Sequence, residues 1–513
     1  MRFERTPAYL FVIFLLITSV VGQHHDMPSG DQKPANESLG EISFPTSGPA
    51  EAQKHFIRGV LLLHSFEYGR AKASFAEASS LAPDFAMAYW GEAMTYNHSI
   101  WGEQDRNAAL TALKKLGSTP TERAAKTPTD REKLYLTAVE CLYGEGTKTE
   151  RDAAYSAALS DLSSRFPDDI EARAFYALSL LGLTNTTRST ENYMRAASVA
   201  EEIFAAHRDH PGALHYLIHA YDDPVHAPLG LRAARMYGTV AKGASHAQHM
   251  PSHIFFALGM WDDAISANIA SMKTARDGGQ KGYHPLHWLV HAYLQQGKSD
   301  DAARLIAIVE TDIKNDPSAA ARNYLALCRA TWLVETRGTD LPGVLDPIDA
   351  AGIRSIVAFS GYDLAAGLEY VRRNDLAAAR RASERIRQRI PVGEQVPPTD
   401  GVAASRYDNV DRSDVDMLMV MGRTLNAAIE FASGNKAAGV EKAIRAAEAE
   451  DKLVFEYGPP AMVKPAWEAA GDMLLKVGRT KDAAAAFQRV LKQYPNRKLS
   501  NDGLRTATAQ AAK

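Results

Sequence analysis

Three pairs of histidines with i, i+4 spacing follow one another in the middle of the chain, in the segments HYLIHAY, HMPSHIF and HWLVHAY. On a helix, two imidazoles at this spacing lie about 6 Å apart on one face and can close on one metal ion. Imidazole nitrogen suits Zn, Cu, Fe or Ni and does not suit Ca²⁺ or Mg²⁺, which prefer oxygen. The pairs are His215 with His219, His249 with His253, and His287 with His291.

The histidines are unevenly distributed along the chain. Eleven of the sixteen lie between His207 and His291, and none follows His291. One HxxxH pair is more often a pair of surface or packed residues, whereas three in succession favour a set of metal ligands. The zinc-protease motif HExxH is absent from these segments, because Tyr216, Met250 or Trp288 stands where that motif needs a glutamate as general base.

The pairs need helices to present them, and the hydrophobic pattern predicts helices. From about Ala52 onward apolar residues recur at i, i+3, i+4 and i+7, which predicts an all-α fold. Small residues, aromatic residues and proline also recur with a period of 34 residues. In the unit from Ala52 these are Gly59, Ala71, Phe75, Ala78 and Pro83. In the unit from Lys464 they are Trp467, Gly471, Leu474, Gly478, Ala483, Phe487, Val490 and Pro495.

This spacing resembles the tetratricopeptide repeat (TPR). The resemblance covers residues 51–497 and implies helix-turn-helix repeats stacked in a right-handed solenoid. The pattern is less regular near 103–165 and 336–360, and a long loop is expected near 391–412. Weaker units begin near Ala86, Pro211, Ser245, Tyr283, Ser360 and Met419.

The resemblance also implies where the histidines point. In TPR arrays, positions 2, 5, 9, 12 and 13 of the first helix of each unit line the concave groove. Histidines occupy positions 2, 5 and 9 in the units from Ser245 and Tyr283, and positions 5 and 9 in the unit from Pro211. We predict that these eight imidazoles share one groove and bind metal: His215, His219, His246, His249, His253, His284, His287 and His291.

A second group of residues is expected near the same groove. Two carboxylates take positions 12 and 13 of the unit from Pro211, two histidines take position 13 of the first two units, and one histidine lies in the turn DDPVHAP, where it is either a ligand or a turn residue. These candidates are Asp222, Asp223, His64, His98 and His226. His207 and His210 flank a helix end and are expected at the surface or as capping residues.

The amino terminus predicts export. Arg2 and Arg5 precede an apolar run over residues 8–21, which is shorter than the roughly 20 residues that span a bilayer. We expect a signal peptide over residues 1–22, an uncleaved anchor being the alternative. A flexible leader over 23–50 and a flexible tail over 498–513 complete the division of the chain. The mature protein is then periplasmic or extracellular, with no stable membrane span.

The charge balance argues against a nucleic-acid partner, and the positions of the cysteines argue against a CxxC metal site. With 58 Lys plus Arg against 61 Asp plus Glu, the chain has no basic surplus for a phosphate backbone, so nucleic acid is not expected as a partner. Cys141 and Cys328 form no CxxC motif and lie in apolar helical patterns, where a free thiol packs as a small core residue.

The sequence therefore predicts an exported TPR metalloprotein whose groove binds one or more transition-metal ions, with copper, zinc and iron not distinguished. Redox or hydrolytic turnover is left open. The alternatives are a metal carrier or storage protein without turnover, and a scaffold that holds a peptide or small molecule in the groove. TPR clamps for acidic chain ends use Lys, Arg and Asn at positions 5, 9 and 13, where this chain has imidazole or the apolar residues Phe56, Val60, Trp90 and Met94.

Overall fold

The computed structural model describes residues 37–183, 188–338, 341–352, 355–391, 412–454 and 456–512. In these ranges helix follows helix, apart from one short hairpin in which β1 (Asn97–His98) pairs antiparallel with β2 (Glu103–Gln104) around the 3-10 turn η1 (Ser99–Trp101). The all-α prediction is confirmed. The signal-peptide prediction, residues 23–36 of the predicted leader and residues 392–411 of the predicted loop lie outside the described residues.

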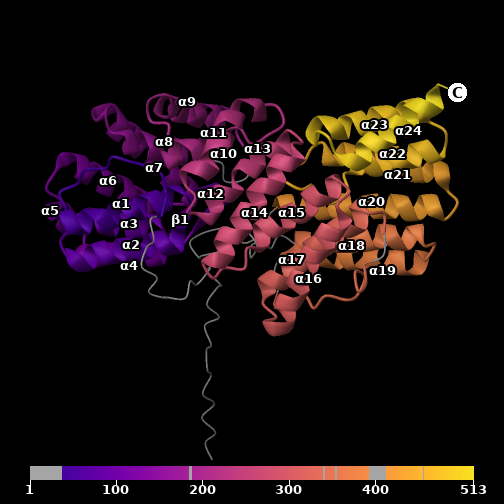
Figure 1. Ribbon diagram of the computed structural model, residues 1–513, viewed down its shortest axis with the longest axis horizontal. Coiled ribbons are helices and arrows are strands. Elements are labelled where there is room, and N and C mark those ends of the chain that lie inside the picture. Colours follow the sequence, from indigo (N-terminus) through magenta and orange to yellow (C-terminus); the bar gives the residue numbers. More distant parts are fainter. Residues whose placement is uncertain are drawn as a thin grey trace, which may run out of the picture.

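The helices follow one another along the long axis of the molecule (Figure 1). One end holds α1 (Ala50–His64), α2 (Tyr68–Leu81), α3 (Ala86–Met94), α4 (Arg106–Leu116), α5 (Pro120–Ala125), α6 (Asp130–Leu142), α7 (Lys148–Arg165), α8 (Ile170–Gly182) and α9 (Thr190–Ala206). The middle holds α10 (Pro211–Ala220), α11 (Ala227–Val240), α12 (Ser245–His249), α13 (Pro251–Ala257), α14 (Trp261–Asp277), α15 (Tyr283–Gln295), α16 (Ser299–Asn315) and α17 (Ala319–Glu335). The other end holds α18 (Ile356–Arg372), α19 (Leu376–Arg389), α20 (Arg412–Ala432), α21 (Lys436–Glu450), α22 (Ala466–Lys476), α23 (Thr480–Gln493) and α24 (Lys498–Ala511).

In the first and last units, the two helices of the pair pack closely because position 8 is glycine and position 24 is phenylalanine. A Cβ atom on Gly59 would lie 2.6 Å from the ring of Phe75, and one on Gly471 would lie 2.8 Å from the ring of Phe487. Such contacts are too short for real atoms, so glycine lets the second helix of the pair press its ring against the backbone of the first. The same pairing in the first and last units confirms the predicted TPR-type repeat.

The first helix of a pair ends in a left-handed residue at position 15. Gly259, Gly297 and Gly478 have φ of 66°, 73° and 75°, and Asn374 has φ of 61°. Glycine and asparagine are the residues that tolerate this conformation best. Phe66 takes the same position in the first unit with φ of 54°.

Packing extends beyond the predicted array at both ends. Residues 37–49 were assigned to the leader, yet Phe44 is buried, with its ring 5.1 Å from Phe56 and 5.0 Å from Tyr135. Residues 498–511, assigned to the tail, form α24, whose Leu499 and Ala507 are buried. Terminal units of a repeat array have an uncovered apolar face, and these two segments cover it.

Proline interrupts the first helix of the unit from Ser245. Pro251 has no N–H to donate, and the helix divides there into α12 and α13. The backbone N–H of Met250 still donates to the His246 carbonyl, at 2.9 Å, so the two segments remain close in direction. This break separates His249 from His253.

The C-terminal region folds back onto the middle of the array. The Trp261 indole donates to the Asn496 carbonyl at 3.3 Å, and the backbone N–H of Lys498 donates to Gln295 at 2.9 Å. The ring of Tyr457 lies 4.9 Å from that of His253. Tyr457 thus lies against His253. The other histidines at positions 5 and 9 are buried as well.

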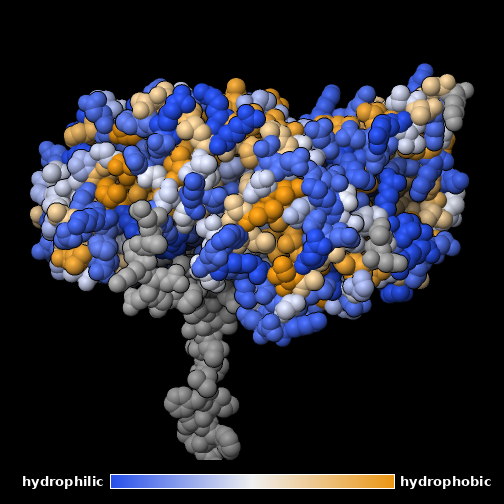
Figure 2. All heavy atoms as spheres, viewed as in Figure 1, coloured by the Kyte–Doolittle hydropathy of each residue, from blue (hydrophilic) through white to orange (hydrophobic). Residues whose placement is uncertain are grey.

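The face of the molecule in Figure 2 is mostly hydrophilic, with hydrophobic atoms in scattered patches. Large apolar side chains that are exposed include Leu81, Val225, Leu229 and Ile269. Among the described residues, no helix combines the length and the apolar character that crossing a membrane requires.

Candidate metal centre

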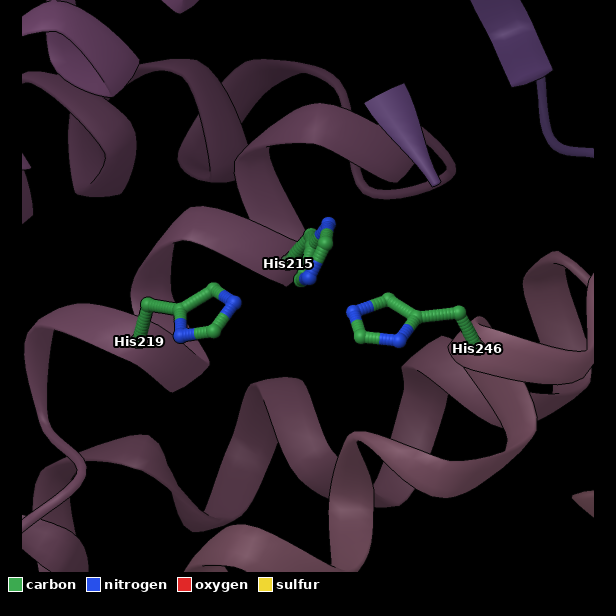
Figure 3. Close-up of side chains that lie close together, drawn as sticks. All are labelled: His215, His219 and His246. Atoms are coloured by element: carbon green, nitrogen blue, oxygen red, sulfur yellow. The ribbon is translucent and has the colours of Figure 1, made fainter. Parts of the chain in front are cut away.

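The first histidine triad consists of His215, His219 and His246. His215 and His219 lie one turn apart on α10, with ring centroids 4.8 Å apart, and His246 on α12 brings its centroid to 5.0 Å from that of His215. The three rings point toward one centre (Figure 3). One nitrogen from each ring lies within 4.8 Å of the others, a spacing that allows one ion to contact all three.

The hydrogen bonds of the first triad leave its inward nitrogens without partners. Nδ1 of His215 lies 2.7 Å from the backbone carbonyl of His64 and must donate to it, so Nε2 of His215 carries a lone pair. The Nε2 atoms of His215, His219 and His246 are buried and have no hydrogen-bond partner. A buried polar atom without a partner costs about 1–3 kcal/mol. One metal ion would satisfy all three nitrogens.

The second histidine triad consists of His249, His253 and His284, from α12, α13 and α15. Nε2 of His249 lies 3.2 Å from Nε2 of His253 and 3.0 Å from Nε2 of His284. These atoms also fall within 4.8 Å of one another. The second triad therefore repeats the first one unit later.

Fixed acceptors set the tautomers of two rings in the second triad. Nδ1 of His249 donates to Oδ1 of Asn268 at 2.7 Å, and the amide of Asn268 is oriented by its own bond to the Ala264 carbonyl at 2.8 Å. Nδ1 of His253 donates to Oδ2 of Asp222 at 2.5 Å. Both Nε2 atoms then carry lone pairs that face each other, which is unfavourable unless a cation or a proton lies between them.

These outer contacts follow the pattern of metal-binding histidines, which donate their second N–H to a carboxylate or a carbonyl. Asp222, which belongs to the second group of predicted candidates, accepts a hydrogen bond from His253 in this way. Its other oxygen, Oδ1, is buried without a partner. The backbone carbonyl of His64, another residue of the second group, accepts the hydrogen bond from His215. Asn268 on α14 was not predicted, because nothing in its local sequence marks it.

Aromatic rings form one wall of each triad. Phe66 lies 4.3, 5.8 and 5.6 Å from the rings of His215, His219 and His246. In the second triad, Trp288 lies 4.7, 4.5 and 5.7 Å from the rings of His249, His253 and His284. Phe66 was not predicted, although its place at position 15, where later units have glycine or asparagine, marks it in the sequence.

Solvent reaches each triad at the histidine that occupies position 2 of its unit. His246 and His284 are partly exposed, while the other four rings are buried. Burial lowers the pKa of His215, His219, His246 and His249 well below the usual value, and neighbouring imidazoles lower the same pKa values further. These rings are therefore neutral at pH 7, which is the protonation state that binds metal.

A third group, His64, Glu171 and His210, is a satisfied hydrogen-bond network. Glu171 lies 2.7 Å from Nε2 of His64 and 3.0 Å from Nε2 of His210. Nδ1 of His64 lies 2.8 Å from the Tyr216 hydroxyl, and Nδ1 of His210 accepts from the backbone N–H of Ala213. Every ring nitrogen has a partner, so the group needs no ion. His210 caps α10 as predicted, but it is buried rather than at the surface.

The structure places two further predicted ligands away from both triads. Nε2 of His287 lies 3.3 Å from the Thr331 hydroxyl, and burial lowers the pKa of His287 to about 4. His291 lines a small pocket with Trp261 and Arg497.

Three candidates of the second group likewise lie outside the triads. His226 pairs with Asp223 at 2.8 Å, and Arg188 also binds Asp223, at 2.9 Å. His98 stacks on Tyr68, with centroids 3.9 Å apart.

No protein-family model matches the chain, and no curated protein matches it. Solved structures similar to it include the P58(IPK) TPR domain, at 13% identity and TM-score 0.23, over 90% of this chain and 99% of that one. A human IFIT1 dimer with m7Gppp-AAAA is 12% identical, with TM-score 0.37, over 92% of each chain. Yeast Tom70 is 10% identical, with TM-score 0.29, over 90% of this chain and 89% of its own. The assignment of TPR-type repeats accordingly rests on the helix pairs and the 34-residue spacing of the chain itself.

Proposed function

We propose that this protein binds transition-metal ions, one at each histidine triad. The observation that carries the proposal is the convergence of three Nε2 atoms in each triad, with outer hydrogen bonds that force lone pairs inward at His215, His249 and His253. The first triad is hard to explain as packing, because its three Nε2 atoms are buried without a hydrogen-bond partner. The second triad has the same arrangement of rings one repeat later, with its Nε2 atoms in contact with one another.

The ligand sets favour copper or zinc over harder ions. Each triad offers three imidazoles and no carboxylate ligand, and three protein ligands leave one coordination position open for water or a substrate. An open position is what a redox or hydrolytic centre needs, and a carrier or storage site without turnover is the alternative. The amino-terminal apolar run supports export as part of the same proposal.

Burial of the histidine face argues against the scaffold alternative at this part of the groove. A peptide clamped there would need to reach positions 5 and 9, and His215, His219, His249 and His253 are all buried. Positions 5 and 9 of the first two units are buried as well, at Phe56, Val60, Trp90 and Met94, so a peptide partner would have to bind elsewhere on the chain.

Metal analysis of untagged protein tests the proposal. After exposure to Cu and Zn salts and removal of excess metal, we expect two ions per chain, one per triad. The double variant His215→Ala/His219→Ala should lose one ion, and His249→Ala/His253→Ala should lose the other.

His287→Ala is the matched control, because His287 is a buried histidine on the same set of helices and lies outside both triads. This variant should retain both ions. Wild-type protein that binds no metal under these conditions would refute the proposal, and loss of an ion from His287→Ala would show that the ligand set is wrong.

A further inference from the structure

The two triads adjoin each other. Helix α12 carries a ligand of each, His246 at one end and His249 at the other, with ring centroids 6.3 Å apart. A second contact across the boundary joins His219 of the first triad to His253 of the second, with centroids 5.9 Å apart. Two ions bound in these triads would therefore be near neighbours.

A buried carboxylate lies at the same boundary. Asp222 follows His219 by three residues and holds His253 through Oδ2, which links it to both triads. Its Oδ1 is buried and has no hydrogen-bond partner. Oδ1 is therefore a free acceptor that can take a hydrogen bond from a bound water molecule.

The charge balance indicates what such a pair of ions would require. All six ligands are imidazoles, and Asp222 is the one buried carboxylate bonded to a triad ring among the described contacts. Repulsion between two divalent ions is four times that between two univalent ions at the same distance. A divalent pair in this setting is stabilised by an additional anion, and an anion between the ions counters the repulsion most effectively.

We infer that the two triads form one dinuclear centre, in which two divalent ions share a single small anionic oxygen ligand of the hydroxide class. This inference rests on the proposed metal binding and adds that the sites are not independent. Each ion keeps three imidazoles and gains the shared ligand as its fourth. Shared single-atom ligands are a recurring feature of two-metal centres, whose ions lie about 3.5–4 Å apart.

Electron paramagnetic resonance of the full chain loaded with Cu²⁺ tests the inference. A shared oxygen ligand couples the two unpaired spins, so protein with two Cu²⁺ per chain should give a low-temperature signal that integrates to well under two spins. The variant His215→Ala/His219→Ala should hold one Cu²⁺ and regain one full spin per chain. Azide, as a probe anion, should bind wild-type protein at one per two Cu²⁺.

The outcomes separate the two proposals. Two Cu²⁺ per chain with two fully resolved spins and two azides would overturn the shared ligand while leaving metal binding intact. No bound copper would overturn the proposed function itself. The azide stoichiometry is measured on wild-type protein, so it decides the question even if the double variant fails to fold.

Discussion

At the scale of single residues, Asp222 has the role in the proposed metal centre of orienting His253 and not of binding the ion. Its carboxylate fixes the tautomer and the orientation of His253. Loss of such an outer contact typically weakens metal binding 10–100-fold. We expect Asp222→Asn to lower the affinity of the second triad by that amount, measured by competition with a chromophoric chelator. Asp223→Asn is the control, because Asp223 binds His226 and Arg188 outside both triads; equal losses in the two variants would contradict this role.

Phe66 has a strained, left-handed backbone conformation, and its ring packs against the three rings of the first triad. An L-residue in the left-handed region costs about 1 kcal/mol, which glycine avoids. Both Phe66→Ala and Phe66→Gly should destabilise the protein, because a buried ring is lost. Phe66→Gly should be the more stable of the two by about 1 kcal/mol in urea unfolding, since alanine keeps the backbone strain. The reverse order would show that the positive φ is not a source of strain.

Buried neutral histidines make stability depend on pH. Burial lowers the pKa of His287 from 6.5 to about 4, so the unfolded chain takes up a proton before the folded one as the pH falls. The contribution of neutral His287 to the free energy of unfolding is complete above pH 6.5 and is lost as the pH drops toward 4. For metal-free protein, His287→Gln should reduce the pH dependence over this window by roughly 3 kcal/mol. Urea unfolding of both proteins at each pH would measure it, and parallel curves would contradict it.

At the scale of elements, the sequence predicts the helix pairs and the helix face on which the histidines lie. It does not predict how the histidines are divided between two triads. All eight were placed in one groove, whereas the structure joins each HxxxH pair to the position 2 histidine of the following unit. His246 thus completes the pair of α10, and His284 completes the pair of α12 and α13. The pair His287 and His291 has no third ring because no histidine follows it in the sequence.

Other parts of the centre could not be predicted from local sequence. Asp222 and Asn268 reach His253 and His249 across 31 and 19 residues, so their roles depend on how neighbouring helices pack. The surroundings of His253 also include a residue from a distant part of the chain, Tyr457. Repeat spacing describes each unit and its neighbour, and it carries no information on where the far end of the array returns.

At the scale of the whole molecule, Arg497 fastens the last repeat to the middle of the array. It lies 2.6 Å from Glu335 on α17 and 2.7 Å from Glu468 on α22, and all three side chains are buried. Removing one partner of a buried ion pair leaves uncompensated charge and typically costs 3–5 kcal/mol. We expect Arg497→Ala to lower stability by about that amount in urea unfolding.

Arg489→Ala is the comparison for that experiment. Arg489 pairs with Asp451 at 3.6 Å, and about half of each side chain is exposed. Exposed pairs contribute about 0–1 kcal/mol, so this variant should be close to wild type. Similar losses in the two variants would mean that Arg497 does not hold the two regions together.

The returning C-terminal segment also has a consequence for the order of events during synthesis. The six triad histidines, from His215 to His284, are made before Tyr457, which lies against His253 of the second triad. Domains form from the amino-terminal side as the chain emerges. The second triad is therefore complete while the segment that lies against His253 is still missing. Under the proposed metal binding, this interval is when an ion reaches that triad most easily.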